Sequence, residues 1–202
     1  KADLQQALGL QVRPDCPLLG FVGRLVEQKG LELMLPVLEQ ILASPAQLVL
    51  LGTGDSTYEK RLQALATAHP DSMAVVLAYN ETMAHRIEAA ADIFLMPSLF
   101  EPCGLNQLYS LRYGTLPVVR EVGGLADTVV DANEQTLEAG TATGFVFRRP
   151  MSGKLLDAVQ RAIGLWHESA TWRQLQHNAM DQDFSWQQSA DRYLELYRSV
   201  TD

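Results

Sequence analysis

The stretch SLFEPCGL at residues 98–105 decides the fold, because an apolar strand at residues 93–96 leads into it and an amphipathic helix leaves it. A carboxylate, Glu101, thus stands at the carboxyl end of a buried strand. Gly104 and Leu105 follow, where a helix can begin with its backbone N–H groups pointing outward. In an open α/β sheet, anionic ligands bind at this position. The stretch therefore predicts a parallel α/β sheet with an anion site at the end of this strand.

A second stretch, GRLVEQKG at residues 23–30, repeats this arrangement after another apolar strand. It supplies two cations, Arg24 and Lys29, flanked by glycines that permit close approach of the backbone. Arg can bind a diphosphate through two hydrogen bonds, and Lys can neutralise it as a point charge. The alternative is that both are solvated residues beside a tight turn. Together the two stretches predict a diphosphate site with a carboxylate beside it.

Apolar runs alternate with helical patterns, which predicts a doubly wound, Rossmann-like parallel sheet of about six strands. The runs are continuous, so the strands should be covered on both faces. We expect strands at residues 18–22, 47–51, 74–77, 93–96, 116–119 and 145–147. We expect helices at residues 31–42, 57–68, 81–91 and 105–113. Pro36 should kink the first helix or move its start.

End signals and composition refine this division of the chain. Asn80 is suited to cap the start of the third helix, and Gly114 is suited to end the fourth. The stretch at residues 131–143 is irregular and is expected to be the most mobile loop. After Pro150 the pattern is purely helical. We therefore predict a Rossmann-like core at residues 1–150 and a helical tail at residues 151–202 that caps the sheet or reaches a neighbour.

Further side chains near the two stretches are candidates for the site. Tyr79 follows the third strand, where it can stack on a nucleobase or lie at the rim of the core. Cys103 stands at a helix start, which favours a reactive thiol, although a buried and unreactive thiol is the plainer interpretation. Glu101 can bind sugar hydroxyls or anchor the helix N-terminus. The histidines and acidic residues show no metal-ligand spacing, so we expect metal-independent chemistry.

The composition limits the partners. The 202 residues are 47% hydrophobic and 20% charged, which suits a sizeable core, and the formal net charge is −8. Such a surface repels nucleic acid and anionic membranes, so we expect neither as a partner. The sequence shows no signal peptide and no membrane span, and its two distant cysteines suit a reducing compartment. We therefore expect a cytosolic setting.

Four motifs together resemble bacterial glycogen synthases and plant starch synthases, which are retaining glucosyltransferases with the two-domain GT-B fold. They are the two stretches described above, YGTLPVVR at residues 113–120 and GGLADTV at residues 123–129. The motif DFSW at residues 183–186 extends the resemblance to near the end of the chain. The resemblance covers only the C-terminal, nucleotide-sugar-binding half of such an enzyme. It implies the cytoplasm if the protein is bacterial and a plastid if it is from a plant.

The resemblance also implies roles for individual residues. The implied catalytic residue is Glu101, and the implied nucleotide-sugar-binding residues are Arg24, Lys29, Tyr79, Cys103, Gly104 and Leu105. The two cations would bind the diphosphate of ADP-glucose, and the tyrosine would stack on adenine. The carboxylate would hold the glucose with the cysteine close by, and two backbone amides would receive the distal phosphate. The implied reaction transfers glucose, with retention and without a cofactor, to the nonreducing end of an α-1,4-glucan.

The missing half of the enzyme limits what this chain is expected to do. In the family, the N-terminal half brings a Lys-x-Gly-Gly-Leu loop, the acceptor groove and a catalytic His. We therefore expect the helices at residues 151–202 to pack on the core and toward that domain. We expect the chain alone to bind nucleotide weakly and to transfer no glucose.

One departure from the family pattern and two alternative functions remain. The family commonly has a basic residue and Thr where this chain has Glu121 and Val122, so Arg120 alone would supply the local charge. The first alternative is a GT-B transferase that uses a UDP-sugar. The second is a noncatalytic domain that binds nucleotide or glucan and regulates a partner.

Overall fold

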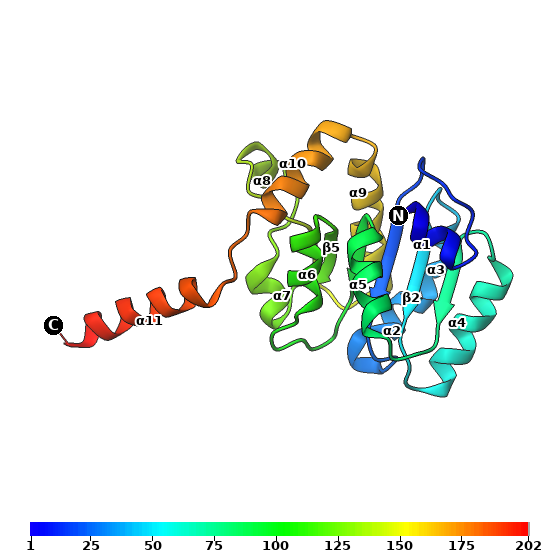
Figure 1. Cartoon of the computed structure of the whole chain (residues 1–202), viewed down its shortest axis with the longest axis horizontal. Coiled ribbons are helices and arrows are strands. Elements are labelled where there is room, and N and C mark those ends of the chain that lie inside the picture. The colour runs from blue at the N-terminus through cyan, green and yellow to red at the C-terminus, as the bar shows by residue number, and fades with distance from the viewer. Residues whose placement is uncertain (202) are drawn as a thin grey trace.

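Six parallel strands form one sheet in the order β3-β2-β1-β4-β5-β6 (Figure 1). The computed structural model describes residues 1–201. The strands are β1 Leu18–Val22, β2 Gln47–Leu51, β3 Met73–Val76, β4 Ile93–Met96, β5 Leu116–Arg120 and β6 Phe145–Phe147. The predicted doubly wound parallel sheet is confirmed, and each strand lies within one residue of its expected bounds.

Helices connect the strands and continue beyond the last one. They are α1 Ala2–Ala7, α2 Leu31–Met34, α3 Leu38–Leu42, α4 Ser56–Ala68, α5 Glu81–Ala90, α6 Asn106–Tyr113, α7 Gly123–Thr128, α8 Glu134–Glu138, α9 Ser152–Trp166, α10 Ser169–Met180 and α11 Trp186–Thr201. Two short 3₁₀ turns are η1 Glu27–Lys29 and η2 Leu35–Val37. No helix within residues 1–201 is both long and apolar enough to cross a membrane.

Proline and capping residues explain several helix boundaries. Pro36 lies in η2, which separates α2 from α3, so the helix expected at residues 31–42 is interrupted where a proline cannot donate its hydrogen bond. The expectation that residues 131–143 are irregular is wrong, because they contain α8. Asn133 and Thr136 form a capping box there, in which each side chain accepts a hydrogen bond from the other residue's backbone N–H.

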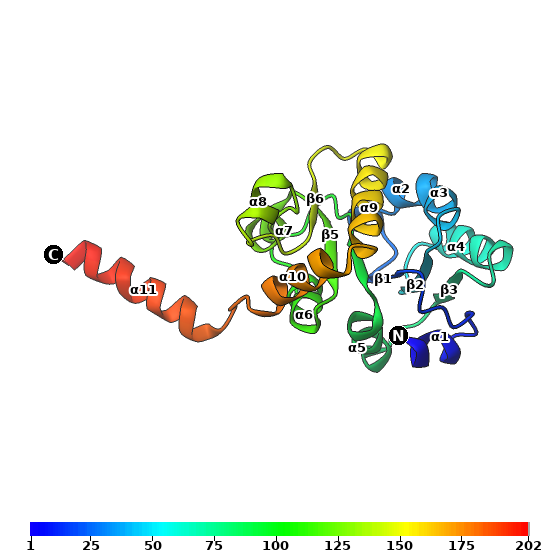
Figure 2. The same cartoon turned by 90° about the horizontal axis from the view of Figure 1, so that it is seen from above.

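Alternate residues of the strands pack on opposite faces of the sheet. Leu19 and Leu48 belong to one buried apolar cluster, while Leu18 and Val49 belong to a second. Helices α2, α3, α4 and α9 contribute to the first cluster, and α1, α5 and α7 contribute to the second. Figure 2 shows α9, α2 and α3 on one side of the sheet and α5 with α1 on the other. Both faces of the sheet are covered by helices, as the continuous apolar strands predict.

The helical tail divides into two parts. Helix α9 contacts β6 and β5, and α10 contacts α9 and α6, with Trp172 and Leu175 buried. Helix α11 instead extends away from the sheet in both views (Figures 1 and 2), and Trp186 at its start is exposed. Helices α9 and α10 thus pack on the core, whereas the packing of α11 toward a further domain stays a prediction. A domain boundary at residue 150 stays a prediction.

Candidate functional site

The strand order reverses between β1 and β4, which are neighbours although β2 and β3 come between them in the chain. Loops that leave such a pair of strands diverge toward opposite faces, which opens a crevice at the carboxyl ends. The stretch at residues 23–30 follows β1, and the stretch at residues 98–105 follows β4. Both sequence motifs therefore emerge at the topological switch point of the sheet.

Lys29 and Glu101 meet at this switch point. Nζ of Lys29 lies 2.5 Å from Oε2 of Glu101, and Oγ of Ser98 donates to the same oxygen at 3.1 Å. The side chain of Glu101 is 10% exposed and that of Lys29 is 22% exposed. An ammonium group has three donors, so Lys29 can hold this carboxylate and still donate to a ligand. The cation of one motif and the carboxylate of the other thus share one small site.

The two loops are locked together by close backbone contacts. Gly30 has a φ of 78°, and a Cβ added there would lie 2.0 Å from the carbonyl oxygen of Pro97. The backbone N–H of Leu99 donates to the carbonyl of Gln28 at 2.8 Å. The side-chain amide of Gln28 in turn donates to the carbonyl of Phe100 at 2.9 Å. We call the two loops, at residues 23–30 and 97–101, the switch-point unit.

Arg120 supports the switch-point unit from β5. Its Nε donates to the carbonyl of Ser98 at 2.8 Å, and its Nη2 donates to the carbonyl of Leu99. The sequence suggested that Arg120 supplies local charge, but its guanidinium donates to these backbone oxygens and positions the loop. The neighbouring Glu121 forms an ion pair with Arg148 at 2.9 Å, and Arg148 is largely exposed.

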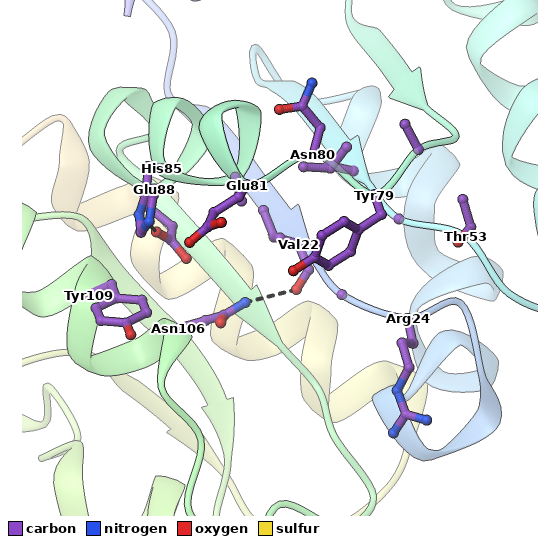
Figure 3. Close-up of a pocket in the computed structure, with 15 residues that line it drawn as sticks. Val22, Arg24, Thr53, Tyr79, Asn80, Glu81, His85, Glu88, Asn106 and Tyr109 are labelled. Carbon is purple, nitrogen blue, oxygen red and sulfur yellow. Dashed lines mark hydrogen bonds and ion pairs between the residues drawn. The ribbon is translucent and has the colours of Figure 1, made fainter.

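A cleft of about 360 Å³ opens beside the switch-point unit (Figure 3). The ends of β1, β2 and β3 form one side of it, and α5 and α6 form the other. Asn106, the first residue of α6, donates to the carbonyl of Val22 at 3.0 Å and so ties α6 to β1. A Cβ at Gly52 would lie 1.9 Å from the carbonyl oxygen of Gly23, so the exits of β1 and β2 touch through glycines.

Arg24 and Tyr79 both line this cleft. Tyr79 is 93% exposed, and in Figure 3 its ring projects from the end of β3 toward Asn106. An aromatic residue at the rim of the core would be more buried. Nη2 of Arg24 donates to Oε1 of Gln28 at 3.3 Å, and through Arg24 the switch-point unit forms part of the cleft wall. The predicted cap of α5 is confirmed, since Oδ1 of Asn80 accepts a hydrogen bond from the backbone N–H of Met83 in the first turn.

The loop before α6 presents backbone groups rather than a capping side chain. Gly104 has a φ of 77°, and Leu105 at the N-cap position makes no side-chain cap hydrogen bond. Nε2 of Gln107 donates to the carbonyls of Cys103 and Gly104 at 3.0 Å each. Its Oε1 is buried without a hydrogen-bond partner among the described residues. Cys103 is exposed, so the interpretation as a buried thiol is wrong.

The predicted site residues therefore fall into adjoining groups. Arg24 and Tyr79 line the cleft, whereas Lys29 and Glu101 form the ion pair next to it. The other predicted residues, Cys103, Gly104 and Leu105, follow on the loop that leads to α6 and do not line the cleft. Their roles toward a ligand stay predictions. Within residues 1–201, no group of three or more His, Cys, Asp or Glu side chains could hold a metal ion.

A polar cluster in the cleft was missed by the sequence reasoning. Nδ1 of His85 lies 3.0 Å from Oε2 of Glu88, and the ring of Tyr109 meets the His85 ring edge-on with centroids 5.7 Å apart. Glu88 is only 2% exposed. Burial raises the pKa of its carboxyl, and the hydrogen bond with His85 opposes that rise. The spacing of three residues on a helix was the available signal, because it puts both side chains on one face.

Comparison with known proteins identifies similar sequences. The model of a family described as glycosyl transferases group 1 matches residues 9–179. Glycogen synthase 1 of Methylococcus capsulatus is 53% identical over 197 residues, which are 98% of this chain and 40% of that protein. The glycogen synthase of Marinobacter nauticus is 54% identical over 200 residues, which are 99% of this chain and 40% of that protein. The chain thus spans about 40% of the length of these curated relatives.

A solved structure agrees with these sequences. The catalytic domain of starch synthase IV from Arabidopsis thaliana, bound to ADP and acarbose, is similar with a TM-score of 0.86 at 35% identity. The match covers 99% of this chain and 42% of that chain. The resemblance to glycogen and starch synthases is confirmed, and so is the predicted fold of a GT-B C-terminal domain.

Proposed function

The chain belongs to the glycosyl transferases group 1 family, and we propose that it is the nucleotide-sugar-binding part of a retaining glucosyltransferase. The proposed enzyme transfers glucose from ADP-glucose to the nonreducing end of an α-1,4-glucan, as in glycogen synthesis. The observation that carries this proposal is the Lys29–Glu101 ion pair at the switch point, beside an open cleft. A diphosphate needs a cation and a sugar needs hydrogen-bonding groups, and the pair supplies both at one place.

The cleft suits a nucleoside diphosphate. Arg24 and Lys29 lie on the same loop after β1, and both can donate to phosphate oxygens. The glycines at residues 23 and 52 let a ligand approach the backbone where β1 and β2 end. The exposed ring of Tyr79 offers a stacking surface for adenine. In this proposal the nucleotide lies along the cleft with its diphosphate toward the switch-point unit.

Charge development explains how these residues would assist the reaction. The bond between the anomeric carbon and the diphosphate breaks, so the sugar gains positive character and the departing group gains negative charge. Arg24 and Lys29 would stabilise the departing diphosphate. Glu101 would orient the glucose through its hydroxyls, with Cys103 close to the sugar. The backbone amides at residues 104 and 105 would receive the distal phosphate at the start of α6.

The remaining groups belong, in this proposal, to the part of the enzyme outside this chain. That part would bind the glucan acceptor and complete the catalytic site. The bacterial relatives named glycogen synthase support the glucan product. A setting in the bacterial cytoplasm is part of this proposal. The starch synthase solved with ADP and acarbose supports ADP as the nucleotide and a glucan as the acceptor. We expect this chain alone to bind ADP and to transfer no glucose.

Calorimetric titration of ADP into the chain tests the nucleotide site. We expect saturable binding that Lys29→Ala weakens about 10- to 100-fold, because a hydrogen bond to a charged group contributes about 1.5–3 kcal/mol. Lys154→Ala is the matched control, since Lys154 pairs with Asp157 on the surface of α9. It should leave the affinity unchanged, and UDP should bind more weakly than ADP. An unchanged chain that gives no saturable heat with ADP refutes the nucleotide site.

Turnover of the full-length enzyme tests the role of Glu101. We expect Glu101→Gln to lower kcat for ADP-glucose by about 100-fold or more while ADP affinity changes little, because the carboxylate acts on the sugar. UDP-glucose should be the poorer donor. Unchanged turnover in Glu101→Gln would instead identify a noncatalytic binding domain, and a strong preference for UDP-glucose would overturn the choice of nucleotide.

A further inference from the structure

The end of the cleft opposite Arg24 carries polar side chains that the proposed reaction does not use (Figure 3). His85 and Glu88 lie one turn apart on α5, and Tyr109 faces them from α6. All three line the same cleft as Arg24 and Tyr79. Side chains on two packed helices are held more firmly than side chains on loops, so this end has a defined shape.

The contact between His85 and Glu88 fixes which ring nitrogen faces a ligand. Nδ1 of His85 lies 3.0 Å from Oε2 of Glu88, which is almost fully buried. When Glu88 is ionised, its carboxylate only accepts hydrogen bonds, so the contact assigns the proton to Nδ1 of His85 as the donor. In the neutral form of this tautomer the lone pair is on Nε2, which is then an acceptor. The edge-on contact with Tyr109 orients the half-exposed ring toward the cleft.

The charges along the cleft give the ligand a direction. Arg24 is at one end, whereas the carboxylates of Glu81 and Glu88 lie at the other. A phosphate is attracted to the cationic end and repelled from the acidic end. The acidic end therefore suits a neutral group that donates a hydrogen bond.

We propose that His85 accepts a hydrogen bond from a neutral donor of the bound nucleoside, either the exocyclic amino group of the base or a ribose hydroxyl. The inference rests on the proposed function, because it assigns a role within the nucleotide cleft. His85 is then a specificity-determining residue, and Glu88 is a positioning residue that acts through it. A nucleotide with a carbonyl in place of the amino group, or without the hydroxyl, leaves the Nε2 acceptor without a partner.

Nucleotide analogues test this inference with the chain at pH 7.5. ADP, inosine 5′-diphosphate, 2′-deoxy-ADP and 3′-deoxy-ADP are titrated into the unchanged chain, His85→Phe and the control His177→Phe. His177 is exposed on α10, and it does not line the cleft. We expect the unchanged chain and the control to bind one analogue about 10-fold more weakly than ADP. His85→Phe should bind ADP and that analogue within about twofold of each other. Weak binding of the inosine nucleotide identifies the amino group, and weak binding of a deoxy nucleotide identifies the hydroxyl.

The outcomes separate this inference from the proposed function. If His85→Phe keeps the discrimination, or weakens all four nucleotides equally, the inference fails and the nucleotide site stands. If the unchanged chain binds no ADP, the proposed function and the inference both fail. A thermal melt checks folding, and Glu88→Gln, which preserves the shape of the side chain, serves if His85→Phe does not fold. Glu88→Gln should reduce the ratio of the affinity for ADP to that for the analogue at least threefold. An unreduced ratio overturns the inference.

Discussion

The switch-point unit and the cleft beside it differ in how completely they are assembled without a ligand. In the switch-point unit, Lys29 and Glu101 already satisfy each other, and the loops that carry them are joined through Gly30 and Pro97. In the cleft, Tyr79 is 93% exposed. One region is preorganised, and the other is open.

The difference teaches where the cost of binding falls. Preorganised groups need no rearrangement when charge develops, so the region assigned to the reaction gains from being locked. Exposed side chains such as Arg24 and Tyr79 must be ordered by the ligand, and that ordering reduces the affinity they provide. The chain therefore places its rigidity at Lys29 and Glu101, and its freedom at Arg24 and Tyr79 in the cleft.

Substitution of Gly30 should break the preorganised region and have the largest effect. Gly30→Ala forces a Cβ against the carbonyl of Pro97 at a positive φ, so we expect the free energy of unfolding to fall by more than about 3 kcal/mol. The matched control is Gly164→Ala in α9, where an added Cβ meets nothing within 4 Å. It should raise stability by up to about 1 kcal/mol. Urea unfolding measures both, and equal stability of the two variants would contradict the locked loops.

Substitution of Tyr79 in the open cleft should weaken ADP binding and leave the stability of the fold unchanged. We expect Tyr79→Ala to weaken ADP binding about 3- to 10-fold, because stacking contributes about 0.5–1.5 kcal/mol. Its melting temperature should stay the same, since the ring is almost fully exposed. Tyr79→Phe keeps the ring and should keep the affinity. Calorimetry and a thermal melt measure the two properties, and a large loss of stability in Tyr79→Ala would show that the ring supports the fold.

The smallest expected effect concerns the pH dependence of stability at Glu88. Burial raises its pKa in the folded chain above its ordinary value, and the hydrogen bond with His85 opposes that rise. The folded chain holds this proton more tightly than the unfolded chain. The contribution of Glu88 to the free energy of unfolding is therefore largest below the pKa that Glu88 has in the unfolded chain. It is lost as the pH rises through the pKa that Glu88 has in the folded chain.

We therefore expect Glu88→Gln to become more stable relative to the unchanged chain as the pH rises from 4 to 8. This range begins just below the ordinary pKa of 4.5 and extends above it, because the folded pKa is raised. Urea unfolding at several pH values measures this difference. Glu195→Gln on the exposed α11 is the control, and its difference should not vary with pH. A difference for Glu88→Gln that is constant or falls with pH would contradict the effect of burial.

Much of the fold was predictable because buried parallel strands have a simple signature. Continuous apolar runs located all six strands, and Asn80 and Gly114 marked helix ends through their known capping geometry. The bounds of β3 shifted by one residue because Met73 and Leu77 are both apolar, so either could end the run. Helix α7 was missed because its N-cap residue, Val122, has no capping side chain.

The site was predictable in its positions but not in its contacts. Strand ends pointed to Lys29 and Glu101, and the strand order then brought them together. The contacts of Arg120 with the carbonyls of Ser98 and Leu99 were not predictable, because they depend on which strand lies beside β5. The pair of His85 and Glu88 was missed because helical spacing alone cannot distinguish a solvated pair from one that α6 covers.

Helix α5 fixes the distance between the two ends of the cleft. Its N-cap residue, Asn80, directly follows Tyr79, and Glu88 is eight residues beyond Asn80, which is about 12 Å along the helix axis. A single inserted residue would advance the far end by about 1.5 Å and turn it by about 100° away from the opening. The separation between Tyr79 and the end of the cleft that carries His85 and Glu88 therefore cannot be adjusted gradually. Replacing side chains changes what each end recognises, whereas the spacing between the two ends is set in whole helical turns.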